Sequence, residues 1–178
     1  MERILGESEV ARMRLYALDR GAWEASSADL PVEKKNISLF SLFIDGEKRS
    51  VKTMIGRAFF YLTARGRFWV YYVTDRGSGQ VIHTSYVTEK SFKFPFMSPG
   101  EIHIGPCYTA PSHRGRGIYR KVLRGICADR RETNSRAYMM VHEDNLPSIR
   151  GIEAAGFRHI GSVERTALLK VYRRTDHG

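Results

Sequence analysis

Residues 101–131 read EIHIGPCYTAPSHRGRGIYRKVLRGICADRR, and this stretch decides the fold of the chain. The segment from Glu101 to Thr109 alternates and contains Ile, Tyr and Thr, which predicts a strand. Pro111 ends the strand because proline cannot donate to a sheet. After a glycine-rich turn at Arg114–Gly117, apolar residues recur at the spacing of a helix. They are Ile118, Val122, Leu123, Ile126 and Cys127. The stretch therefore predicts a strand, a tight turn and a helix.

The turn at Arg114–Gly117 has the chemistry of an anion-binding site. The first N–H groups of a helix have no partner within it, and they carry a partial positive charge. Glycine has no Cβ, so a ligand can approach the backbone closely. Arg120, Lys121 and Arg124 add positive charge within the next two helical turns. The pattern favours a pyrophosphate site, and a basic turn without a ligand is the alternative.

Two segments resemble motifs of the GNAT N-acetyltransferases. Residues Arg114 to Tyr119 resemble the acyl-CoA-binding signature Gln/Arg-x-x-Gly-x-Gly/Ala, except that Tyr119 stands where glycine or alanine is usual. Residues Asn145 to Phe157 resemble a later element of the family: an asparagine, a small residue three positions on, a short helix and Gly-Phe. The two motifs occur in the family's order, about thirty residues apart, and the resemblance covers roughly residues 81–172.

The order of expected elements indicates an α/β fold, with a mixed sheet and helices on its faces, in a single domain over residues 1–178. The resemblance implies the GNAT fold, in which the central strand separates from its neighbour and the cofactor enters between them. Gly105–Pro106 would fit a local break in that strand. The expected elements are a strand or short helix at 11–20, a loop at 25–35, strands at 37–44, 68–73, 81–87, 136–141, 159–163 and 166–172, a turn at 45–46, a helix at 51–64 and a short helix after residue 145.

The resemblance also implies which residues bind coenzyme A. Tyr108 and Thr109 occupy the strand-end positions whose backbone groups pair with the pantetheine arm. The turn and the first helical residues would hold the pyrophosphate: Arg114, Gly115, Arg116, Gly117, Ile118 and Tyr119. Asn145 matches the family's asparagine near the cofactor, and an ordinary helix cap is its alternative role.

The catalytic residues cannot be carried over from the family. The usual acidic residue falls at Gly105–Pro106, and the usual tyrosine falls at Ile152. Acetyl transfer to an amine needs a proton acceptor for the amine and a proton donor for the leaving thiolate. The candidate bases are His83, Glu101 and His103, and the candidate acid is Tyr119. A structural role is the alternative for each of them.

Composition narrows the partners. The chain carries a formal charge of +10, which suits nucleic acid, an anionic membrane or an anionic cofactor. A nucleic-acid partner is not expected, because the sequence contains no recognisable recognition helix or RNA-binding motif. The two cysteines, Cys107 and Cys127, form no metal-binding pattern, so no metal is expected. Neither a membrane-spanning run nor a secretory leader is recognisable, which predicts a cytoplasmic protein.

Together these features predict an acetyl-CoA-dependent N-acetyltransferase. We expect direct transfer to the primary amine of a small molecule such as an amino sugar, through a ternary complex and without an acetyl-Cys107 intermediate. The alternatives are acetylation of a protein N-terminus or lysine, and a GNAT-like module that binds CoA without catalysis. A homodimer is a further possibility. The sequence contains no motif for a particular acceptor.

Overall fold

The computed structural model describes residues 12–23, 30–38, 42–44, 47, 50–166 and 171–175. Their strands form one sheet of eight in the order β2-β3-β4-β5-β6-β1-β7-β8. The strands are β1 (Arg12–Asp19), β2 (Glu33–Asn36), β3 (Phe68–Thr74), β4 (Val81–Glu89), β5 (Glu101–Thr109), β6 (Arg136–His142), β7 (Arg158–Arg165) and β8 (Tyr172–Arg174). The helices are α1 (Val51–Thr63), α2 (Ile118–Arg130) and α3 (Leu146–Ala154), with 3-10 turns η1 (Arg20–Ala22) and η2 (Pro111–His113).

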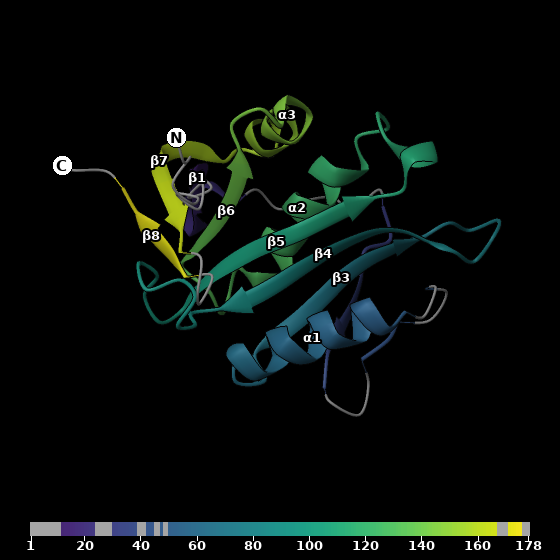
Figure 1. Ribbon diagram of the computed structural model, residues 1–178. Helices are drawn as coiled ribbons and strands as arrows, with labels where there is room; N and C mark the ends of the chain where they lie inside the picture. Colours follow the sequence, from purple (N-terminus) through teal and green to yellow (C-terminus); the bar gives the residue numbers. More distant parts are fainter. Residues whose placement is uncertain are drawn as a thin grey trace, which may run out of the picture.

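Both faces of the sheet are apolar, and each is covered differently. Helix α1 lies across β3 and β4 on one face, and α2 lies on the other (Figure 1). The alternation of β3 shows the division: Phe68 and Val70 pack in a core with Ala64, whereas Tyr71 and Val73 pack in the core beneath α2 and α3. Successive side chains of a strand point to opposite faces, so one strand supplies two cores. The mixed α/β class with flanking helices is confirmed.

Most of the expected elements lie where the sequence placed them. The helix expected at 51–64 is α1, and the two strands at 68–73 and 81–87 are the antiparallel pair β3 and β4. The first element, left open between strand and helix, is strand β1.

The expectations for residues 25–44 were wrong where the structure describes them. Glu33–Asn36, expected as loop, is the edge strand β2, which pairs with β3 although its sequence EKKN is polar. Among the described residues of the strand expected at 37–44, Ser38 is an isolated bridge residue, and residues 37 and 42–44 have no regular structure. An edge strand is held by backbone pairing and needs no apolar alternation, which explains the shift. The turn at 45–46 lies outside the described residues.

Of the strand expected at 166–172, the structure describes Thr166, Val171 and Tyr172. Thr166 and Val171 lie outside any strand, and β8 begins at Tyr172. The connection from Lys90 to Gly100, expected to be irregular, is irregular.

Strand β5 separates from β6 partway along its length. The two strands pair in parallel only over Glu101–His103, although β5 continues to Thr109. Beyond His103, β5 pairs with β4 alone, with a shift of register between Ser85 and Val87. The Gly105–Pro106 peptide bond, which is cis, lies in this part of β5. The expected break and separation of the central strand are therefore present.

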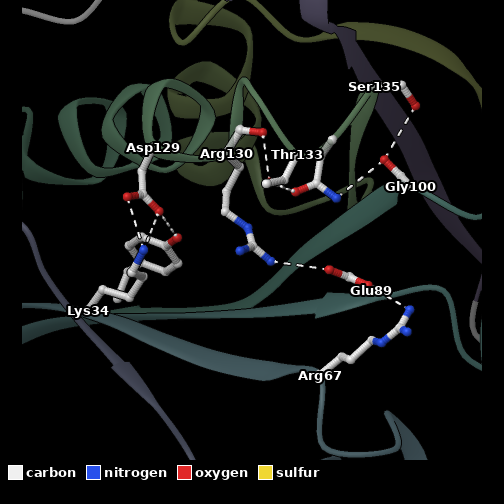
Figure 2. A network of polar contacts seen from close by, with 10 residues as sticks. Lys34, Arg67, Glu89, Gly100, Asp129, Arg130, Thr133 and Ser135 are labelled. Atoms are coloured by element: carbon white, nitrogen blue, oxygen red, sulfur yellow. Dashed lines mark hydrogen bonds and ion pairs between the residues drawn. The ribbon is translucent and has the colours of Figure 1, made fainter.

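We call the start of β5, where it pairs with both β4 and β6, the closed end. A polar network joins this closed end to the C-terminal end of α2 (Figure 2). Arg130 lies with its guanidinium carbon 3.8 Å from the centre of the Trp69 ring and one nitrogen 3.5 Å from Glu89. Asp129 accepts hydrogen bonds from Lys34 and from the Tyr71 hydroxyl. These contacts hold α2 against β2, β3 and β4, and they fix the direction in which the opposite end of α2 points.

Candidate functional site

The N-terminus of α2 has the backbone geometry and the charge of an anion-binding site. Gly115 and Gly117 have φ angles of +74° and +73°, a left-handed conformation that side chains disfavour. Gly117 is the N-cap residue and supplies no side-chain hydrogen bond to the first turn of the helix. Arg114 donates from Nε to the carbonyl of Thr109 at 3.1 Å, which fastens the turn to the end of β5. Arg116 and Arg120 are exposed beside it. The uncapped helix end is therefore surrounded by positive charge.

A cavity of about 580 Å³ joins this turn to the gap between β5 and β6. Its walls come from β5, the turn, the start of α2, β6 and α3, together with Met13 of β1. The predicted cofactor residues that line it are Tyr108, Thr109, Arg114, Gly115, Gly117, Ile118, Tyr119 and Asn145. Arg116 is the predicted cofactor residue that does not. One continuous cavity thus brings together two segments that were predicted from separate motifs.

The three candidate bases lie outside this lining. His83 is fully buried on the α2 face of the sheet. Glu101 accepts hydrogen bonds from the backbone N–H of Ser98 at 2.6 Å and from the Tyr138 hydroxyl at 3.3 Å. His103 is buried, with its ring centre 4.4 Å from that of Phe94. None of the three touches the cavity as the structure describes it.

Burial keeps both histidines neutral. It lowers the pKa of His83 to about 4. Burial, with the nearby positive charge of Lys93, lowers the pKa of His103 to about 3. A neutral imidazole with so low a pKa is a weak base at pH 7, where a general base is most effective with a pKa near the working pH. Nδ1 of His103 is also buried without a hydrogen-bond partner.

A chain of buried polar side chains was not predicted. His83 Nδ1 lies 2.7 Å from Thr109 Oγ1, His83 Nε2 lies 2.8 Å from Ser85 Oγ, and Ser85 Oγ donates to Cys107 Sγ at 3.2 Å. Burial, together with hydrogen bonding to Cys107, raises the pKa of Tyr119 well above its ordinary value. The missing signal was strand register: His83 and Ser85 are two residues apart on β4, and only pairing sets them opposite Thr109 and Cys107.

Asn145 caps α3, as its alternative role required. Its side-chain oxygen accepts from the backbone N–H of Ser148 at 3.3 Å. Asn145 also lines the cavity, so a contact with a bound cofactor stays a prediction.

The residues present fit coenzyme A by an observation independent of any motif. A Cβ added at Gly115 would meet no atom within 4 Å, and one at Gly117 would reach only the end of Arg120. Open space therefore lies where a side chain at either glycine would stand, next to the start of α2, and the charge beside it suits phosphate.

The fold and the site define a class of protein in which a sheet splits along its central strand and a cavity extends from the split to the N-terminus of a helix. A family model described as the Acetyltransferase (GNAT) family matches residues 32–157, and the chain belongs to this family. Members of this family typically transfer an acetyl group from acetyl-CoA. No curated protein matches the chain.

Solved structures share the fold at low sequence identity. A GNAT-family protein from Novosphingobium aromaticivorans DSM 12444 aligns with a TM-score of 0.57 and 16% identity, over 87% of this chain and 62% of that one. A tandem GNAT protein from the clavulanic acid biosynthesis pathway aligns with a TM-score of 0.58 and 14% identity, over 90% and 55%. A glucosamine N-acetyltransferase region in a fungal β-N-acetylglucosaminidase aligns with a TM-score of 0.55 and 11% identity, over 85% and 20%. The chain therefore spans less than two thirds of each of these proteins.

Two further properties hold for the described residues. None of their helices is long and apolar enough to cross a membrane. No group of three or more His, Cys, Asp or Glu side chains among them is placed to hold a metal ion.

Proposed function

We propose that the protein is an acetyl-CoA-dependent N-acetyltransferase that moves the acetyl group directly to a primary amine of a small molecule. The observation that carries the proposal is the single cavity that joins an uncapped, arginine-flanked helix N-terminus to the gap between β5 and β6. Such a cavity suits a ligand that is anionic at one end and extended at the other. An amino sugar is the first acceptor to test.

The chain's own residues would divide the work along the cavity. The turn from Arg114 to Tyr119 would hold the pyrophosphate, because its N–H groups and arginines are the available donors. Tyr108 and Thr109 would orient the pantetheine arm by backbone pairing, since β5 there is no longer hydrogen-bonded to β6. The bound cofactor would supply an activated acetyl group at the split. Tyr119 lines the same cavity and would hold a proton at its hydroxyl for the leaving sulfur.

Removal of the amine proton needs a separate account. His83, Glu101 and His103 lie outside the lining, so each would act on the amine only through an intervening water. We infer that the acceptor enters as the free amine, and that positioning beside the acyl group supplies much of the rate enhancement. The ascending limb of the pH–rate profile would then follow the pKa of the acceptor, and would move when one amine replaces another.

Two alternatives share this cofactor site. One is acetylation of a protein N-terminus or lysine, for which the same cavity would serve. The other is binding of CoA without catalysis, and the residues Pro106 and Ile152 at the family's usual catalytic positions favour it. Turnover with a small amine separates both from the main proposal.

The test has two arms. Calorimetry measures CoA and acetyl-CoA binding, and thiol release is followed with acetyl-CoA and a panel of amines that includes amino sugars, amino acids and a lysine peptide. We expect binding of both cofactors, and release that depends on one class of small amine. Absence of binding at millimolar cofactor would refute the proposal, whereas binding without turnover on any amine would establish the non-catalytic alternative.

A further inference from the structure

The buried chain of polar side chains is closed off from the cavity in its middle and touches the cavity at its ends. Thr109, Cys107 and Tyr119 line the cavity, whereas His83 and Ser85 have no exposed surface and lie behind them. A buried polar group costs free energy unless it is hydrogen-bonded. The four side chains here form hydrogen bonds with one another, which indicates that the positions of Thr109 and Cys107 in the cavity wall are constrained.

The hydrogen bonds of this buried series all donate in one direction. Ser85 gives its only hydroxyl proton to Cys107 Sγ, so it accepts from His83 at Nε2. Because His83 is neutral, its Nδ1 has no proton and accepts from the hydroxyl of Thr109. Donation thus runs from Thr109 through His83 and Ser85 to the sulfur of Cys107. A neutral imidazole with one donor and one acceptor fits the middle of such a chain.

Tyr119 is seated at the end of this chain by a glycine. A Cβ added at Gly151 of α3 would lie 2.6 Å from Cδ1 and 3.0 Å from Cε1 of the Tyr119 ring. The ring therefore lies directly on the α3 backbone, in space that exists because residue 151 has no side chain. Tyr119 and Cys107 line the same cavity, and a hydrogen bond between their side chains contributes to the raised pKa of Tyr119 and opposes the rise in the pKa of Cys107.

We propose that His83 and Ser85 are positioning residues, which act through Cys107 to hold the Tyr119 hydroxyl at the point where the cofactor's sulfur leaves. This role rests on the proposed acetyltransferase function. When the thioester breaks, the Tyr119 O–H turns from Cys107 Sγ to the leaving thiolate and gives it the proton, so an O–H bond breaks and an S–H bond forms. The phenolate then takes up, through water in the cavity, the proton that the attacking nitrogen loses. His83 gains and loses no proton in the cycle, which separates this role from that of a base.

The first test needs no cofactor and measures how the buried hydrogen bonds affect the reactivity of Cys107. Iodoacetamide alkylation of Cys107 is followed at pH 8.5 by peptide mass spectrometry, with the buried Cys127 as internal reference. Burial raises the pKa of the Cys107 thiol to about 11, while the donors Ser85 and Tyr119 oppose that rise. Ser85→Ala and Tyr119→Phe should each slow alkylation severalfold, because the thiolate loses a donor. A variant that merely loosened the site would speed alkylation.

A matched control comes from the next residue of β4. The side chain of Thr84 points to the other face of the strand, so Thr84→Ala should leave the alkylation rate of Cys107 unchanged. If Ser85→Ala speeds alkylation or leaves it unchanged, the chain does not constrain Cys107 and the proposal is refuted.

The second test separates positioning from base catalysis. Ser85→Ala and His83→Leu should lower kcat by roughly three- to tenfold, the loss expected for one hydrogen bond. The KM for acetyl-CoA should change less than twofold. His83→Gln keeps an N–H donor for Ser85 and should recover most of kcat, with an unshifted pH–rate profile. If His83 were the base, Gln would be as impaired as Leu and the ascending limb would change.

The contact between Gly151 and the Tyr119 ring can be tested by a double-mutant cycle. Gly151→Ala should lower kcat severalfold because the ring must move, and it should add little in a Tyr119→Phe background. Gly125→Ala on α2 is the control, since its Cβ would lie at an ordinary 3.5 Å from Val32. Additive effects would show that the seat does not act through the hydroxyl. If wild-type protein turns over no amine, the proposed function fails, and the alkylation test still decides whether the chain holds Cys107.

Discussion

The two ends of strand β5 differ in what lies beside them. At its start, Glu101–His103 is hydrogen-bonded to β4 on one side and to β6 on the other. At its end, Cys107–Thr109 keeps β4 as its partner and faces a cavity where β6 would be. We call the end of β5 that faces the cavity the open end. A histidine is buried at each end: His103 at the closed end, and His83 of β4 behind the open end. One strand is therefore paired on both sides at its start and lines the cavity of the proposed cofactor site at its end.

The two histidines show how the same residue serves each end. The ring of His103 is packed against Phe94, with Nδ1 unpaired. Both ring nitrogens of His83 are hydrogen-bonded, and its neighbours line the cavity. The unpaired buried nitrogen of His103 costs free energy at the closed end. The two hydrogen-bonded nitrogens of His83 hold neighbouring side chains in place at the open end.

Acid should destabilise both ends, and this is the largest effect we expect. Both pKa values are lowered in the folded state, to about 4 for His83 and about 3 for His103. The unfolded chain therefore binds more protons below pH 6.5, and stability falls as pH falls toward those values. Between pH 7 and 4.5 each histidine should remove on the order of 2 kcal/mol from the free energy of unfolding.

Denaturant unfolding of wild type, His83→Gln and His103→Gln at both pH values checks this expectation. Each variant should lose part of the pH dependence, because glutamine does not titrate. A variant with the full wild-type dependence would show that its histidine is not buried in the neutral form.

Gly117→Val should damage the open end alone. Valine at a φ of +73° strains the backbone by about 1–3 kcal/mol, and its methyl groups block the free N–H groups of α2. We expect CoA affinity, measured by calorimetry, to fall roughly tenfold to a hundredfold. Gly79→Val is the matched control, since its φ is +67° in the turn between β3 and β4. That variant should lose similar stability and bind CoA normally; equal affinity losses would place the phosphates elsewhere.

Arg130→Met should damage the closed end alone. It removes the guanidinium that stacks on Trp69 and reaches Glu89. Figure 2 shows the contact between Arg130 and Glu89. We expect a loss of about 1–2 kcal/mol in the free energy of unfolding, because Glu89 is still paired with Arg67. CoA affinity should be unchanged within twofold, and Arg131→Met, at an exposed neighbour, should change neither quantity. A tenfold loss of affinity in Arg130→Met would mean that the two ends are coupled.

The sequence predicted the open end better than the closed end. The turn at Arg114–Gly117 and the cap at Asn145 depend on local spacing, which a single sequence displays. Strand β2 was missed because an edge strand can be polar on both faces. The chain through Ser85 was missed because it depends on the register of two strands, and nothing in the sequence states that register.

The catalytic candidates show the same limit. His83 and His103 were chosen because a histidine titrates near neutral pH, but that property holds only while the ring is hydrated. Periodicity could place His103 on one face of a strand, yet it could not show that the loop from Lys90 to Gly100 covers that face. Burial by distant segments therefore changed the chemistry that the residue type suggested.

The smallest effect we expect is at Cys107, which should never carry the acetyl group. Burial raises the pKa of its thiol to about 11, so at pH 7.5 only a few molecules in ten thousand would hold the nucleophilic thiolate. The nearest histidine is separated from the sulfur by Ser85, and Ser85 donates to the sulfur and removes no proton from it. A cysteine nucleophile needs the opposite arrangement, a base that takes its proton.

Intact-mass measurement after incubation with acetyl-CoA alone should therefore show no acetyl adduct, and initial-rate plots should intersect as for a ternary complex. Cys107→Ser, which keeps an acceptor for Ser85 and Tyr119, should retain most of kcat. Parallel rate plots with an acetyl group trapped on Cys107 would instead require His83 to reach the thiol through Ser85 as a proton acceptor, which reverses the direction of the whole chain.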